Sequence, residues 1–163
     1  MKKLIYTLLI IIALTNNSFA AGSSSDNDST PKASDYTKAK NLIEAAKKYE
    51  KKGKIEKAQE RYAKAQKLFL KSNDKKPLQA DTLNYLGFTT RKLGDFEGGE
   101  KFYLQGLQIE PNHNGINEYL GELYVATNRM DMAKERLEVL KTCSCKEYKQ
   151  LKEIIEGTKK SKY

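Results

Sequence analysis

EYLGELY, residues 118–124, nearly repeats the stretch NYLGFTT at residues 84–90. One Tyr-Leu-Gly triplet begins at Tyr85 and the other at Tyr119. The interval between them is about 34 residues, the length of one helix-turn-helix unit in a helical solenoid, where successive units stack and share a continuous apolar core. The interval predicts an all-α chain built from stacked helix pairs.

The residues after each triplet keep the same order of types. A turn residue follows, Gly94 in one unit and Asn128 in the other, and apolar residues then recur at helical spacing. Pro111 closes the first of these units. Gly99 and Gly106 stand in its second helix, where each should lower helix stability by up to about 1 kcal/mol.

A weaker third copy precedes these two units. Tyr49, Gly53 and Ile55 begin a series that matches the turn and second helix of the unit around Gly94. The offset from Gly53 to Gly94 exceeds the triplet interval by seven, and we assign the excess to an insertion around residues 72–79. The alternative is an unrelated amphipathic hairpin packed on two true repeats.

The Leu-Gly pairs have a physical explanation in a stack of helices. Leu86 and Leu120 are expected to pack between the two helices of their own unit. Gly87 and Gly121 are expected to remove a Cβ where a neighbouring helix comes closest. A bulky residue at either glycine should overpack the contact, which typically costs about 1–3 kcal/mol.

These features resemble the tetratricopeptide (TPR) repeat. More narrowly, the NYLG and EYLGELY units and a cysteine pair before an E-Y-x-x-L helix resemble a group of secreted bacterial TPR proteins. The resemblance implies an α-α superhelix of about three repeats with a C-terminal capping helix, acting as a non-enzymatic scaffold for a protein or peptide. The expected domain covers residues 36–157, with repeats at about 39–72, 80–113 and 114–142 and a cap helix at 145–157.

The resemblance also implies a partner groove along the first helices of the units. On each of these helices a stripe at i, i+4 and i+7 keeps the repeat offsets, so stacking would place the stripes side by side. The predicted groove residues are Ile43, Lys47, Glu50, Asn84, Phe88, Arg91, Glu118, Glu122 and Val125. Phe88, an aromatic residue with polar neighbours, is the expected hot spot. The alternative is that this face is only solvated helix surface.

The N-terminus has the pattern of a secretory signal peptide. Lys2 and Lys3 precede the apolar run 4–14, and Ser18-Phe19-Ala20 offers a small-x-small cleavage site. We expect cleavage after Ala20 and export, most readily to the periplasm; the alternative is an uncleaved anchor in the inner membrane. Residues 21–35 are small and polar, and predict a disordered linker.

Charge is unevenly distributed along the chain. Residues 32–80 alone carry a net charge of +9, equal to that of the whole chain, whereas residues 81–142 carry −3. A basic half favours weak contact with an anionic membrane; the alternative is an ordinary solvated lysine face. Export argues against a nucleic-acid partner. The oligomeric state cannot be read from these patterns.

The C-terminal region holds the only two cysteines. Ser144 to Glu147 match a helix capping box, which would start the cap helix, and residues 158–163 form a basic tail. Cys143 and Cys145 have three interpretations: a disulfide, free structural thiols, or redox-active thiols, the last giving a thiol-redox protein as the alternative function. A disulfide requires a non-helical segment, because positions i and i+2 of a helix diverge.

No enzyme, cofactor or metal site is predicted. The sequence has no G-x-S-x-G, no phosphate-binding glycine loop and no His near a nucleophile. Met130 and Met132 could join the cysteines in a soft-metal site, but 11 residues of helix separate Met132 from Cys143, about 16 Å. His113 has no second ligand at a recognisable spacing.

Overall fold

The structure is a computed structural model that describes residues 33–161. These residues form one compact unit. The predicted signal peptide at 1–20 lies outside the described residues, as do most of the 21–35 linker and the last two residues of the basic tail. Among the described residues, no helix is long and apolar enough to cross a membrane.

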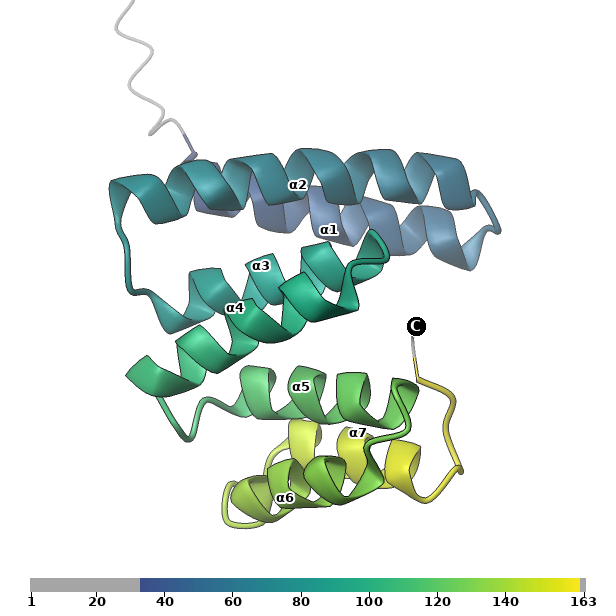
Figure 1. Cartoon of the computed structure of the whole chain (residues 1–163). Coiled ribbons are helices and arrows are strands. Elements are labelled where there is room, and N and C mark those ends of the chain that lie inside the picture. Colours follow the sequence, from purple (N-terminus) through teal and green to yellow (C-terminus); the bar gives the residue numbers. More distant parts are fainter. Residues whose placement is uncertain (1–32, 162–163) are drawn as a thin grey trace, which may run out of the picture. The chain divides into compact units, whose positions relative to one another are not determined.

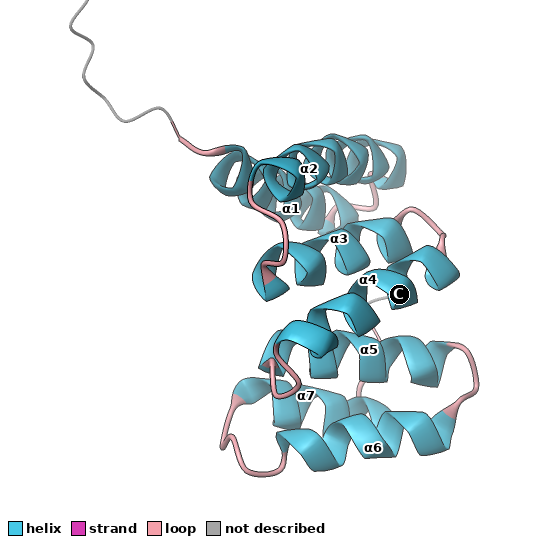
Figure 2. Cartoon of the chain, turned by 60° about the vertical axis from the view of Figure 1, so that its left-hand side comes forward, coloured by secondary structure: helices cyan, strands magenta, loops and turns pink. Residues whose placement is uncertain are grey.

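Residues 33–161 fold into seven α-helices and no strand. The helices are α1 (Asp35–Lys51), α2 (Ile55–Lys75), α3 (Ala80–Lys92), α4 (Phe96–Ile109), α5 (Asn114–Ala126), α6 (Met130–Leu140) and α7 (Lys146–Ile155). Antiparallel neighbours pair as α1 with α2, α3 with α4 and α5 with α6, and the pairs stack in chain order (Figures 1 and 2). The last helix, α7, packs on α5 and closes the stack.

The seven extra residues of the first copy lie in a helix. The helix α2 has 21 residues and α4 has 14, whereas α3 and α5 both have 13. The connections after α2 and α4 each have four residues. The insertion assigned to the region around residues 72–79 thus takes the form of a longer helix: α2 continues through Lys75, about two turns longer than α4.

The two Leu-Gly pairs make different contacts. Both leucines are fully buried. A Cβ on Gly87 would overlap the ring of Tyr103 on α4, which is the partner helix of the same pair. A Cβ on Gly121 would instead overlap the side chain of Leu151 on α7. Both glycines therefore lie where a neighbouring helix comes close, as expected: for Gly87 it is the partner helix of its own pair, and for Gly121 it is α7.

The glycines of α4 also mark close contacts. A Cβ on Gly99 would lie 3.0 Å from the carbonyl oxygen of Gly87, and one on Gly106 would overlap Ile116 of α5. The low helix propensity of these residues is thus accompanied by close packing of α4 against α3 and α5. The two glycines were expected to lower the stability of α4, and the structure adds that they also allow its close packing.

The core consists of two clusters of buried side chains. The first joins α1, α2 and α3 through residues such as Ile43, Phe69 and Leu86. The second joins α5 to its neighbours through residues that include Tyr103 and Leu120. Half-buried Tyr119 packs against both clusters. The apolar core therefore continues along the stack.

A disulfide joins Cys143 and Cys145 in the connection between α6 and α7. Of the three interpretations left open by the sequence, the structure has the disulfide, and the segment is non-helical as that bond requires. The predicted capping box is wrong. Ser144 has a φ of 48°, and Cys145 occupies the N-cap of α7 without a side-chain capping bond.

Candidate functional site

A polar cavity lies along the first helices of the pairs. Its volume is about 320 Å³, and its walls come from α1, α3, the start of α5 and α7. We call it the first-helix cavity. Its lining residues are Lys47, Asp81, Asn84, Tyr85, His113, Gly115, Glu118, Tyr119, Lys146, Glu147 and Gln150.

Three of the nine predicted groove residues line this cavity: Lys47, Asn84 and Glu118. Six of the nine are buried, namely Ile43, Asn84, Phe88, Arg91, Glu118 and Glu122. The remaining residues, Lys47, Glu50 and Val125, are half-buried. The predicted stripes do face the neighbouring first helices, but most of their side chains fill the space between those helices and do not form an open groove.

Phe88, the predicted hot spot, is buried. Phe88 is only 3% exposed, because its ring packs 5.8 Å from the ring of Tyr62 and 5.2 Å from that of Tyr119. The ammonium group of Lys47 lies 5.6 Å from the ring centroid of Phe88. The aromatic stripe residue therefore belongs to the core of the stack.

Arg91 and Glu122 contact each other between α3 and α5. Both side chains are fully buried, and Nη2 of Arg91 lies 3.5 Å from Oε2 of Glu122. Nη1 of Arg91 donates to the carbonyl oxygen of Tyr119 at 2.7 Å. These two predicted groove residues therefore join α3 to α5.

Asn84 is the groove residue whose chemistry fits a ligand. Its side chain is buried, it lines the first-helix cavity, and its Oδ1 has no hydrogen-bond partner among the described residues. Gly115 leaves the space that this amide occupies, since a Cβ there would lie 2.8 Å from Nδ2. A buried amide without a partner for its oxygen usually has an explanation, such as a ligand that completes its bonding.

The sequence stripes missed the residues at the helix starts. Since α3, α5 and α7 all run in the same direction, their first turns lie along one edge of the stack (Figure 1). His113 is the N-cap of α5: its Nδ1 accepts from the N–H of Ile116 at 3.1 Å, and its Nε2 lies 3.2 Å from Asp81. Aligning the first turns of the three helices would have brought His113, Asp81 and Lys146 together.

Charges of both signs surround the cavity, with neutral phenols between them. Lys47 and Lys146 oppose Asp81, Glu118 and Glu147. Burial raises the pKa of the lining tyrosines at positions 85 and 119, and nearby carboxylates add to the effect, so both phenols stay neutral hydrogen-bonding groups near neutral pH. Such a lining can bind polar and charged groups of either sign.

The described residues hold no group of three or more His, Cys, Asp or Glu side chains placed to bind a metal ion. No protein-family model matches the sequence, and no curated protein matches it.

Solved structures do match this fold. The first TPR of Spaghetti (RPAP3) bound to an HSP90 peptide superposes with a TM-score of 0.53 and 21% identity, over 77% of this chain and 95% of that chain. The fold is that of a TPR solenoid. The second TPR domain of human RPAP3 with an HSP70 peptide gives 0.51 and 16%, over 75% and 98% of the two chains. The translocator chaperone SycD of Yersinia enterocolitica gives 0.52 and 16%, over 77% and 86%.

The predicted all-α superhelix with a closing helix is thereby confirmed. In TPR terms α1, α3 and α5 are the first helices of three pairs, and α7 covers the last one. The narrower resemblance to secreted bacterial TPR proteins with NYLG and EYLGELY units stays a prediction.

Proposed function

We propose that this chain is a non-enzymatic scaffold that binds a protein or peptide at the first-helix cavity. The observation that carries the proposal is the amide of Asn84, which is buried, lines the cavity and has no partner for its oxygen among the described residues. A carboxamide both donates and accepts, which is the bonding capacity of a peptide group. It therefore suits the main chain of a bound segment.

The matched structures support a peptide or protein as the ligand class. Two of them hold the peptides SRMEEVD and SGPTIEEVD, and PcrH, which matches with a TM-score of 0.50, holds the chaperone-binding region of PopD. Those ligands belong to those proteins. For this chain, the half-buried rings of Tyr85 and Tyr119 would supply apolar contact beside the amide of Asn84.

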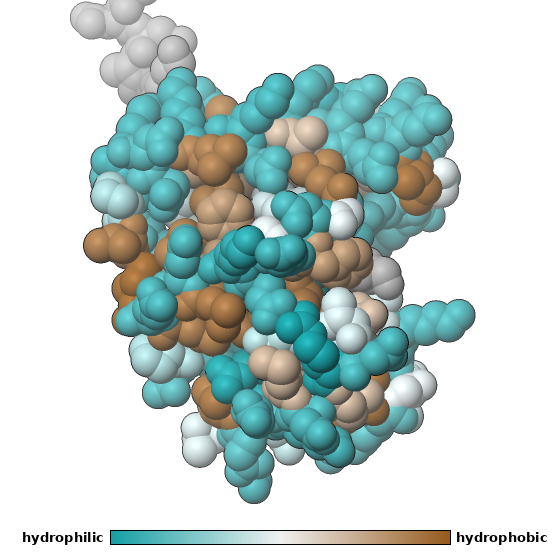
Figure 3. All heavy atoms as spheres, in the orientation of Figure 1, coloured by the Kyte–Doolittle hydropathy of each residue, from teal (hydrophilic) through white to brown (hydrophobic). Residues whose placement is uncertain are grey.

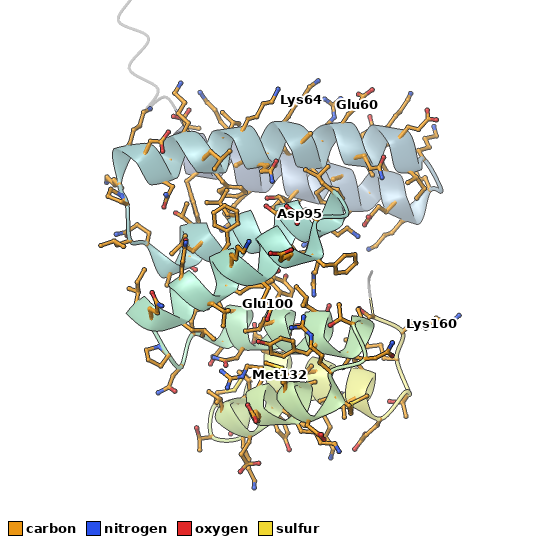
Figure 4. All side chains as sticks on the ribbon, in the orientation of Figure 1. Glu60, Lys64, Asp95, Glu100, Met132 and Lys160 are labelled. Carbon is orange, nitrogen blue, oxygen red and sulfur yellow. A yellow bond between two sulfur atoms is a disulfide. The ribbon has the colours of Figure 1, made fainter. Side chains whose placement is uncertain are left out.

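Photocrosslinking in cells identifies the partner and tests the surface together. A benzophenone amino acid replaces Lys47 or Lys146, which line the cavity, or Met132 as a control on α6 (Figure 4). We expect one partner to crosslink at positions 47 and 146 and not at 132. Equal crosslinking at all three positions would contradict binding at the cavity.

A matched pair of asparagines then tests the mechanism on the captured partner. Asn84→Ala should weaken binding by about fivefold, since one hydrogen bond contributes about 1 kcal/mol. Asn73→Ala is the control, because Asn73 on α2 also has a buried Oδ1 without a partner among the described residues but is not among the residues of this cavity. If both variants bind equally well, the amide of Asn84 does not hold the ligand.

The proposal also covers the cellular location of the protein. The pattern of residues 1–20 supports export to the cell envelope with cleavage after Ala20, and an uncleaved inner-membrane anchor is the alternative. The N-terminal sequence of the protein recovered from the periplasm, read by mass spectrometry, separates the two. A protein or peptide partner, not a nucleic acid, is proposed.

A further inference from the structure

The two ends of the helix stack differ in charge. The first end is formed by α2 with α1, and the last by α6 with α7. Figure 4 shows Glu60 and Lys64 extending from α2 away from α3 and α4, so this side of α2 is an outer face of the stack. Helix α2 has six cationic residues and three acidic ones.

Lysines recur along the outer side of α2 at helical spacing. Lys57, Lys64 and Lys71 are seven residues apart, which is about two turns, so they share one face over roughly 21 Å. Lys67 and Lys75 flank this row, and all five are exposed. We call these five residues the α2 lysine row. On the side of the molecule drawn in Figure 3, hydrophilic side chains dominate the outer rim of α2, and hydrophobic ones gather nearer α3 and α4.

Only part of this positive charge is neutralised within the protein. Asp35 lies 2.6 Å from Nζ of Lys75 and 4.0 Å from that of Lys71. The row's other members, Lys57, Lys64 and Lys67, form no ion pair in the described part of the chain.

The opposite end of the stack is charge-balanced. On α7, Lys149 pairs with Glu153 and Lys152 with Glu156, at 4.0 and 3.7 Å. The outer faces of terminal units must be polar to stay soluble, and both ends meet that requirement. Solubility explains why both ends are polar but not why only one is cationic.

We infer that the α2 lysine row docks the domain on an anionic lipid bilayer. One long helix at the end of the stack offers a nearly linear row of ammonium groups, and a bilayer offers a flat layer of phosphates. Five of the six cations of α2 are lysines, which act as point charges. Arginine, which suits bidentate recognition of nucleic acid, occurs once, at Arg61.

Docking through α2 is compatible with ligand binding. The lysine row lies on α2, whereas the first-helix cavity is lined by α1, α3, α5 and α7 and by the residue before α5. A domain held by α2 therefore keeps its cavity open to a partner. Because the two surfaces share no residue, the membrane proposal does not depend on the ligand proposal.

Vesicle flotation tests the inference with the chain from Ala21 onward, which keeps every described helix and both core clusters. The probes are phosphatidylglycerol vesicles and phosphatidylcholine vesicles at low salt. The test variant is Lys57→Gln/Lys64→Gln/Lys67→Gln. The matched control is Lys134→Gln/Lys149→Gln/Lys152→Gln, which removes the same charge from exposed lysines of α6 and α7.

We expect binding to phosphatidylglycerol only, and its loss at high salt. The α2 variant should bind about a hundredfold more weakly, since each lysine near an anionic surface contributes about a kcal/mol, and the control should bind nearly as the parent does. Equal weakening of both variants would reduce the effect to net charge and overturn the inference. So would equal binding to both lipids, no binding, or binding to single-stranded RNA without binding to vesicles.

Discussion

The junction between the first two helix pairs and the junction between the second and third use different chemistry. At the first, aromatic rings dominate: Phe69 stacks on Tyr85 at 5.1 Å, and Tyr62 meets Phe88 edge-on. At the second, the buried charges of Arg91 and Glu122 meet. Both junctions connect pairs that the sequence repeat makes equivalent.

The repeat register places these residues in corresponding positions. Phe88 and Glu122 are separated by one triplet interval, and so are Arg91 and Val125. A buried aromatic residue of α3 is therefore replaced by a buried acid in α5. The repeat keeps the position of a side chain against the next helix, while the chemistry of the contact is set separately at each junction.

Removal of the Arg91 side chain should lower the free energy of unfolding more than any other change considered below. Arg91→Ala leaves Glu122 buried without its arginine, and breaking a buried pair in this way typically costs about 3–5 kcal/mol. Urea unfolding followed by circular dichroism measures the loss. A loss below about 1 kcal/mol, the level of an exposed pair, would show that the second junction does not depend on this charge.

The double variant Arg91→Met/Glu122→Leu serves as its control. Apolar residues of similar size would make the second junction resemble the first. We expect it to be more stable than Arg91→Ala, because replacing a whole buried ion pair is often neutral or stabilising.

The glycine contacts should give a smaller, graded effect. Gly87→Ala presses on the fully buried, rigid ring of Tyr103, so an overpacking cost of about 1–3 kcal/mol should exceed the helix-propensity gain of about 1 kcal/mol. Gly121→Ala meets the rotatable end of Leu151, and its net cost should be below about 1 kcal/mol. Thermal unfolding ranks the two, and Tyr103→Leu should rescue only Gly87→Ala. The reverse ranking would contradict this assignment.

Alkaline pH should weaken both junctions because it ionises buried tyrosines. The loss of stability per residue should be the smallest of the effects considered. Burial, with Glu100 nearby, raises the pKa of Tyr124 from 10.0 to about 12. Burial and the carboxylate of Glu50 raise the pKa of Tyr62 further. The folded state thus favours the neutral phenols, and their stabilisation is complete below pH 10 and declines as pH rises from 10 to 12. The urea midpoint of the parent protein should be lower at pH 11 than at pH 8, and this difference should be smaller in Tyr124→Phe and in Tyr62→Phe. If both variants keep the same difference as the parent, the linkage is refuted.

Much of the fold was accessible from the sequence because it depends on periodicity. The triplet interval and the stripe from Ile55 to Phe69 predict stacked helix pairs. The helical form of the extra residues was not predicted, because residues 70–75 are mostly polar and carry no further apolar period. Such a polar stretch is compatible with either a helix or a loop, and its contacts with the rest of the fold decide which of the two forms.

The site was less predictable, for a geometric reason. Helical period identifies the residues that share a face, and three of the residues it selected, Lys47, Asn84 and Glu118, line the cavity. It does not give the distance between neighbouring helices. The first helices approach closely enough to bury Phe88 and Arg91, and Gly115, which has no Cβ, leaves room for the Asn84 amide at the cavity.

The disulfide between Cys143 and Cys145 has a consequence for the order of folding events. Its two sulfurs belong to residues only two apart in sequence, so the bond can form in a chain with no tertiary structure. It then closes a very small loop and restricts the unfolded chain only locally. Oxidation therefore requires no prior assembly of the stack, and the bond constrains the turn that leads from α6 to α7.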